Sequence, residues 1–201
     1  INKKIMLEIS RKGQILPASA IRKLVPYAEA AKERGIKIHH LNIGQPDIET
    51  APGALDALIK APRDIVAYTH SAGNMSYRKK LCEYYAKHNI NITPDEIIIT
   101  AGGSEALQFA FTITCNPGDE VLIPQPCYVS YDPCTVLADG VPVAIPLQEK
   151  NEFKLTAEEL EAAITPKTKI LIMPFPNNPT GSIMTKEDLE PIVEVVKKHD
   201  L

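Results

Sequence analysis

The feature that most constrains this chain is the stretch 97–114, which reads IIITAGGSEALQFAFTIT. The β-branched residues at 97–100 are typical of a buried strand and are too few to form a helix by themselves. Gly102 and Gly103 allow the backbone to turn sharply and to approach a ligand closely. Beyond Ser104, a candidate N-cap, apolar residues recur at helical spacing. The stretch therefore predicts a strand, a tight turn and a helix.

A turn of this kind is suited to binding phosphate. The first turn of the predicted helix would direct backbone N–H groups and the positive end of the helix dipole at one point. Two better-known phosphate-binding loops are excluded, because the chain has neither Gly-Lys-Ser/Thr after its glycines nor a G-x-G-x-x-G pattern. A tight turn with nothing bound fits the same residues, so this stretch alone leaves both interpretations open.

Strands and helices alternate along the rest of the chain. Further strands are predicted at 121–124, 141–147 and 169–173, and a short one at 36–41. Helices are predicted at 19–34, 52–60, 76–88, 156–163 and 185–199, with one more between residues 125 and 140. The alternation predicts a three-layer α/β/α fold, with a mainly parallel sheet covered on both faces and an N-terminal arm and helix before it.

Composition narrows the class of protein. The net charge is −3 and no basic block stands out, so a nucleic-acid partner is not expected. The first residues lack the apolar core of a signal peptide, and no apolar run approaches the ~20 residues of a membrane span. The four cysteines do not have the C-x-x-C spacing of a metal site. The adjacent His39 and His40 would point to opposite sides of a strand and could not share a metal ion, so no metal site is predicted. Reduced thiols and a cytoplasmic location are expected.

Three loops follow predicted strands and should therefore lie at the same edge of the sheet. One is the Gly-Gly-Ser turn, one carries Tyr128, and one is the proline-rich segment around Asn178. An aromatic side chain can stack on a planar ring, and an amide can donate to a ring substituent. Phosphate, planar ring and ring substituent together describe pyridoxal 5′-phosphate (PLP). The residues also allow a simpler interpretation, in which Tyr128 is ordinary packing and Asn-Pro-Thr-Gly is a turn.

Four motifs, in this order, carry a family resemblance: LNIGQPD (41–47), ITAGGSEAL (99–107), CNPGDEVLIPQPCYVSY (115–131) and NNPTG (177–181). With them the chain resembles the class I/II aminotransferases, the fold-type I PLP-dependent enzymes typified by aspartate aminotransferase, from about residue 17 to residue 201. The resemblance implies an arm and small-domain segment at 1–48, and the first part of a PLP-binding large domain at 49–201.

The resemblance also assigns roles to site residues. Gly103 and Ser104 match donors to the cofactor phosphate, Tyr128 matches the aromatic residue that stacks on the pyridine ring, and Asn178 matches the asparagine that donates to the phenolic 3′-oxygen. Gly44 matches the glycine whose backbone meets the substrate carboxylate. Tyr68 matches a tyrosine that reaches the phosphate of a neighbouring subunit, which implies a homodimer with shared active sites.

Other parts of the family's active site have no match in this chain. The Schiff-base lysine, the aspartate on the pyridine nitrogen and the arginine that grips the substrate carboxylate are expected beyond Leu201. The chain is therefore expected to be a truncated half that is inactive alone. In the family's sheet, strands from this later part separate the strand at 97–100 from the other three.

The resemblance implies an aminotransferase that moves an amino group between an amino acid and a 2-oxo acid. Aspartate, aromatic and alanine-like donors all remain open. One alternative is a PLP-dependent C–S lyase or ACC-synthase-like elimination enzyme, which shares these motifs. Two others are a non-catalytic ligand-sensing domain, disfavoured by the charge balance, and a catalytically dead homologue.

Overall fold

The computed structural model describes residues 8–16, 19, 21–61, 65 and 67–201 of the 201-residue chain. The chain forms two compact units. One contains residues 24–101, and the other contains residues 102–201 together with the segment before residue 24. We call them the helical unit and the sheet unit. The expected boundary after residue 48 stays a prediction, and residues 1–7, 17, 18 and 20 of the segment 1–48 lie outside the described residues.

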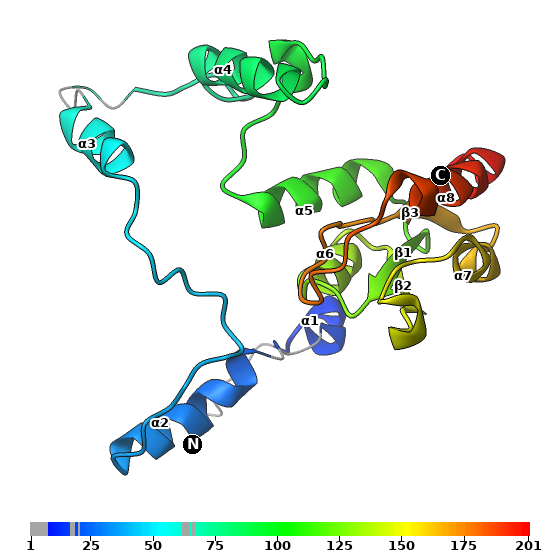
Figure 1. The fold of residues 1–201 in the computed structure, drawn as a ribbon, viewed down its shortest axis with the longest axis horizontal. Helices are drawn as coiled ribbons and strands as arrows, with labels where there is room; N and C mark the ends of the chain where they lie inside the picture. Colours follow the sequence, from blue (N-terminus) through cyan, green and yellow to red (C-terminus); the bar gives the residue numbers. More distant parts are fainter. Residues whose placement is uncertain (1–7, 17–18, 20, 62–64, 66) are drawn as a thin grey trace, which may run out of the picture. The chain divides into compact units, whose positions relative to one another are not determined.

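A parallel three-stranded sheet forms the centre of the sheet unit. Its strands are β1 (Glu120–Gln125), β2 (Val141–Pro146) and β3 (Thr168–Leu171), in the order β2-β1-β3 (Figure 1). In register, Leu122 of β1 lies between Val143 and Leu171. The predictions of strands at 121–124, 141–147 and 169–173 are thus confirmed. The uninterrupted apolar run of β1 suits a central strand that is buried on both faces.

Helices cover both faces of this sheet. On one face, Leu122 packs in a cluster with Leu160 and Ile192. On the other face, Val121 and Ile123 pack with residues that include Phe111. Side chains alternate across a strand, which is why neighbouring residues of β1 enter different clusters. The covering helices are α7 (Ala157–Ala163) and α8 (Lys186–His199) for the first cluster, and α5 (Gly103–Thr114) and α6 (Tyr131–Leu137) for the second. The three-layer α/β/α prediction is confirmed.

Local capping fixes where two of these helices begin. Thr156 and Glu159 form a capping box at α7, and Thr185 and Asp188 form another at α8, as predicted. At α5, by contrast, the N-cap is Gly102, with a φ of 100°, and Ser104 lies inside the first turn. The prediction of Ser104 as N-cap is therefore wrong by two residues. A glycine replaces it because the backbone enters this helix through a positive φ.

The remaining elements are short. The sheet unit also contains α1 (Arg11–Ile15) and the 3₁₀ turn η3 (Glu149–Asn151), and the 3₁₀ turn η1 (Arg22–Leu24) spans the boundary between the units. The helical unit contains α2 (Val25–Glu33), α3 (Pro52–Lys60), α4 (Met75–Ala86) and the 3₁₀ turn η2 (Pro94–Glu96). Of the helix predicted at 19–34, the structure has α2 from Val25, with Pro26 in its first turn, where the fixed φ and missing N–H of proline are tolerated.

Two predicted strands are wrong. Residues 36–41 and 97–100 both lack strand structure, and no described residue pairs with either in a ladder. The N–H of Ile99 instead donates to the carbonyl oxygen of Ala72 at 3.0 Å, and Ile98 is 65% exposed. A β-branched run becomes a strand only where neighbouring strands accept its backbone hydrogen bonds.

Candidate functional site

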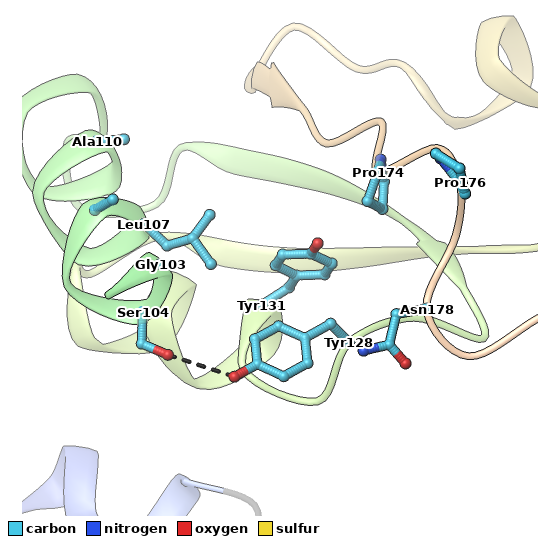
Figure 2. Close-up of a pocket in the computed structure, with 10 residues that line it drawn as sticks. Gly103, Ser104, Leu107, Ala110, Tyr128, Tyr131, Pro174, Pro176 and Asn178 are labelled. Carbon is cyan, nitrogen blue, oxygen red and sulfur yellow. Dashed lines mark hydrogen bonds between the residues drawn. The ribbon is translucent and has the colours of Figure 1, made fainter. Parts of the chain in front are cut away.

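A cavity of about 730 Å³ opens within the sheet unit beside the first turns of α5. Tyr128 reaches it from the loop after β1, and Asn178 from the loop after β3 (Figure 2). Its volume falls in the range typical of small-molecule and cofactor sites. The carboxyl ends of parallel strands are where ligands gather in open α/β sheets. The lining residues are Gly103, Ser104, Ala106, Leu107, Ala110, Tyr128, Tyr131, Pro174, Pro176 and Asn178.

The start of α5 provides an anion-binding corner of this cavity. Gly102 turns the chain into the helix, and Gly103 and Ser104 occupy the first turn, where a helix supplies no acceptors for its own N–H groups. A Cβ added at Gly103 would meet no atom within 4 Å, so the space beside this backbone is open. Two backbone donors, a hydroxyl and the positive end of a 12-residue helix therefore face one region.

Tyr128 contributes the aromatic surface of the site. Its hydroxyl lies 3.5 Å from the Ser104 hydroxyl, and its ring meets the ring of Tyr131 edge to face, with centroids 5.6 Å apart (Figure 2). The hydrogen bond from Ser104, followed by one from Ser130, lowers the pKa of Tyr128 below its usual 10.0. Burial raises the pKa of Tyr131. The Tyr128 side chain thus joins the anion-binding corner to an aromatic wall.

Asn178 belongs to a loop that closes on itself. The N–H of Gly181 donates to the carbonyl oxygen of Asn177 at 2.8 Å, and the N–H of Asn177 donates to the carbonyl oxygen of Ser182 at 2.9 Å. Gly181 has a φ of 73°, a conformation that favours glycine. Asn178 projects from this closed loop and is exposed, so its amide is available to a ligand in the cavity.

The structure brings together four of the six predicted site residues: Gly103, Ser104, Tyr128 and Asn178. Gly44 and Tyr68 belong to the helical unit and are exposed, and their roles stay predictions. Sequence reasoning missed Tyr131, although it follows Tyr128 by three positions and begins the next helix. Pro174 and Pro176, in the proline-rich segment expected at this edge of the sheet, also line the cavity.

The cavity lining offers binding rather than acid–base chemistry. Its side chains are hydroxyl, amide, aromatic or apolar, and none of the described lining residues is Lys, His, Asp or Glu. Burial, followed by the nearby Asp132, raises the pKa of the neighbouring Cys127 to about 11, so its thiol stays protonated at neutral pH. The four cysteines are free thiols, as expected.

The described part of the chain has neither a cluster of metal ligands nor a helix suited to a membrane. Residues 8–16, 19, 21–61, 65 and 67–201 contain no group of three His, Cys, Asp or Glu side chains placed to hold a metal ion. None of the helices formed by these residues has both the length and the apolar character needed to cross a membrane.

The lining residues fit pyridoxal 5′-phosphate. The start of α5 offers donors to a phosphate, the Tyr128 ring offers a face to an aromatic ring, and Asn178 offers a donor to a ring oxygen. These three features come from separate loops and meet in one cavity, as the sequence predicted.

Comparisons with known proteins agree with this geometry. A family model described as "Aminotransferase class I and II" matches residues 36–201. An aromatic-amino-acid aminotransferase of Thermococcus litoralis is 38% identical over 97% of this chain and 50% of its own length. An aspartate aminotransferase of Geobacillus stearothermophilus is 36% identical over 96% of this chain and 50% of its own length.

Solved structures give the same result. The aspartate aminotransferase of Rhizobium meliloti matches 97% of this chain and 49% of its own, with a TM-score of 0.89 and 31% identity. A variant of the Thermus thermophilus enzyme matches 98% of this chain and 52% of its own, with a TM-score of 0.87 and 33% identity. The chain thus spans about half the length of the relatives it matches.

Proposed function

The chain belongs to the class I and II aminotransferases, and from this premise we propose that it supplies the PLP-binding part of an enzyme that transfers an amino group between an amino acid and a 2-oxo acid. One observation carries the proposal. Gly103 and Ser104 at the start of α5, Tyr128 in the loop after β1 and Asn178 in the loop after β3 line a single cavity. A phosphate, an aromatic ring and a ring oxygen each find a partner there.

Each residue has a distinct task in this proposal. The backbone of Gly103 and the hydroxyl of Ser104 bind the phosphate and so anchor the cofactor. The ring of Tyr128 stacks on the pyridine ring and fixes its plane. The amide of Asn178 donates to the phenolic oxygen and fixes the rotation of the ring in that plane. Bound PLP supplies the electron sink that makes the Cα–H bond of an amino acid acidic.

The proton at Cα needs a base that the described lining residues do not provide, since none of them is a lysine or a histidine. We therefore propose that residues 1–201 bind the cofactor but do not complete the transfer alone. The Schiff-base lysine, which in this family also moves the proton, would come from outside this cavity lining. A homodimer is proposed in the same way, with Tyr68 reaching the phosphate of the partner's site and Gly44 meeting the substrate carboxylate.

The donor amino acid is not decided by these residues. The relatives named above are aromatic-amino-acid and aspartate aminotransferases, and another is an asparagine–oxo-acid transaminase of Streptococcus mutans. These names support transfer rather than elimination. We therefore propose a 2-oxo acid as the acceptor, with aspartate, asparagine and aromatic amino acids as the donors to test.

Binding is best tested with ligands that cannot react with surface lysines. Pyridoxine 5′-phosphate keeps the ring, the phosphate and the phenolic oxygen of PLP but has an alcohol in place of the aldehyde, and pyridoxine lacks the phosphate as well. We expect the phosphate ester to bind much more tightly in isothermal titration calorimetry. Tyr128→Ala should weaken both ligands about tenfold by removing the stacking surface, whereas Tyr128→Phe should keep most of the affinity. Equal affinity for the two ligands would contradict the phosphate site.

Turnover separates transfer from elimination. With PLP and an amino donor, an aminotransferase forms a new amino acid only when a 2-oxo acid is present. An elimination enzyme releases ammonia and a 2-oxo acid without an acceptor. In a form of the protein that also carries the Schiff-base lysine, acceptor-independent ammonia release would therefore support the elimination alternative over the proposed one.

A further inference from the structure

We propose that Asn177, which does not line the cavity, is a positioning residue that sets the placement of Asn178 relative to Tyr128. The inference rests on the proposed function, because it concerns how the two side chains are held for the cofactor ring. Asn177 is only 6% exposed, although it lies in a loop whose next two residues are exposed. The hydrogen bonds of this buried amide show which parts of the chain it connects.

The main chain of Asn177 closes the loop that carries Asn178. Its carbonyl oxygen accepts from Gly181 and its N–H donates to Ser182, at 2.8 and 2.9 Å. Within the same loop, the side-chain nitrogen of Asn177 donates to the hydroxyl oxygen of Thr180 at 3.0 Å. These three bonds fix the shape of the loop but not its place in the molecule.

A fourth bond connects this loop to the loop that carries Tyr128. The same side-chain nitrogen donates to the carbonyl oxygen of Pro126 at 2.9 Å. Pro126 lies two positions before Tyr128, in the loop that follows β1. One N–H of this amide therefore bonds within the loop of Asn178, and the other joins that loop to the loop of Tyr128, across 51 positions of sequence. Each loop carries one of the residues assigned to the cofactor ring.

The orientation of this amide is determined by its neighbours. A carbonyl oxygen only accepts, so the atom facing Pro126 must be the nitrogen. The Thr180 hydroxyl can then accept from Asn177 and donate to Ser182, whose hydroxyl donates to the carbonyl oxygen of Glu152 at 2.6 Å. In this series of hydrogen bonds, each group donates to the next, from Asn177 through Thr180 and Ser182 to Glu152. The amide oxygen of Asn177 is buried without a partner among the described residues, which is unfavourable for stability and argues against a role in stability alone.

Hydrogen exchange tests the connection without any ligand. Asn177→Ala should speed amide exchange about tenfold at residues 127–130 as well as at 177–182, because both loops lose a restraint. Asn177→Asp, which keeps the outline of the side chain but has no N–H donor, should do the same. Thr180→Val is the matched control: it removes the acceptor inside the loop and leaves the bond to Pro126, so only residues 177–182 should respond. Exchange confined to 177–182 in the Asn177 variants would overturn the proposal.

Ligand binding tests the positioning itself. When Asn177 is present, Asn178→Ala should weaken the binding of pyridoxine 5′-phosphate about fivefold by removing one donor. In the Asn177→Ala background the same change should cost less than about twofold, because Asn178 is no longer aimed at the ring. Ser104→Ala should weaken ligand binding by the same factor in both backgrounds, since α5 does not depend on Asn177. A merely structural role would leave the effect of Asn178→Ala unchanged.

The outcomes separate this inference from the proposed function. If the unmodified protein binds the ligand but Asn178→Ala loses the same factor in both backgrounds, the positioning role is refuted and the cofactor site stands. If the unmodified protein does not bind pyridoxine 5′-phosphate, the proposed function fails, and the positioning role fails with it whatever the exchange data show.

Discussion

Two four-residue runs in this chain are both predicted to be strands, but they have different structures. Residues 121–124, Val-Leu-Ile-Pro, lie in the central strand of the sheet unit, where Val121, Leu122 and Ile123 are fully buried. Residues 97–100, Ile-Ile-Ile-Thr, belong to the helical unit and form no strand. Within this second run, Ile97 is buried while Ile98 is 65% exposed.

The difference lies in the neighbours that each run finds. The first run has β2 and β3 on its two sides, and helices over both faces of the sheet. For the second run, no described residue supplies a ladder. Strand propensity thus describes how well a side chain fits a pleated, packed surface, and the surface itself must come from other parts of a protein.

The largest expected effect comes from truncating one isoleucine in each run. Ile123→Ala should lower the free energy of unfolding by about 2–5 kcal/mol, because it removes buried methylenes and leaves a cavity. Ile98→Ala should lower it by about 0.5 kcal/mol or less, because most of that side chain is already exposed. Urea denaturation followed by circular dichroism measures both. Losses of similar size would break the comparison.

We expect cofactor binding to be confined to the sheet unit. Ser104→Ala should weaken the binding of pyridoxine 5′-phosphate about tenfold or more, because it removes a hydrogen bond to a charged phosphate. The matched control is Ser76→Ala, another exposed serine in the first turn of a 12-residue helix, in the helical unit. Equilibrium dialysis should find the affinity of this control unchanged. Equal weakening by both changes would mean that helix starts in general, rather than the cavity, attract the phosphate.

A smaller difference in stability is expected between capping residues of the two units. Thr185→Ala should lower the free energy of unfolding by about 1 kcal/mol, because its hydroxyl accepts from Asp188 at the start of the 14-residue α8. In the helical unit, the Thr93 hydroxyl donates to the Glu96 carboxylate at 2.8 Å, but the 3₁₀ turn that follows is three residues long. Thr93→Ala should therefore change stability by less than about 0.5 kcal/mol. A reversed order in thermal melts would contradict this reasoning.

The smallest expected effect is a pH dependence in each unit. The N–H of Thr185 lowers the pKa of Asp188 below its usual 3.8, and the N–H of Thr93 lowers the pKa of Glu96 below its usual 4.5. Both carboxylates therefore contribute stability that is fully present above those usual values and is lost as the pH falls through the lower folded values. Asp188→Asn and Glu96→Gln should each flatten the acid side of the stability curve.

Melting curves between about pH 2 and pH 6 measure this effect. Because α8 packs on the sheet through Ile192, the change at Asp188 should be visible in global unfolding. The change at Glu96 should be visible only in local exchange near η2. A global effect from Glu96→Gln would show that the two units unfold together.

Much of the site could be predicted because its motifs are local. The turn that begins α5, the aromatic residue after β1 and the asparagine after β3 each follow a strand or precede a helix by a few residues. Asn177 could not be assigned in the same way. Its importance depends on a hydrogen bond to Pro126, and nothing in the spacing of the two residues indicates that their loops meet.

By itself, the sequence determined the three strands of the sheet, the capping boxes of α7 and α8, and the set of residue types from which the cavity is built. These follow from short-range patterns, in which each residue interacts with partners a few positions away. Only the tertiary structure decided that residues 97–100 form no strand, that Gly102 rather than Ser104 begins α5, and that Asn177 joins two loops. These depend on which backbone groups are close in space, and distance along the chain does not determine that.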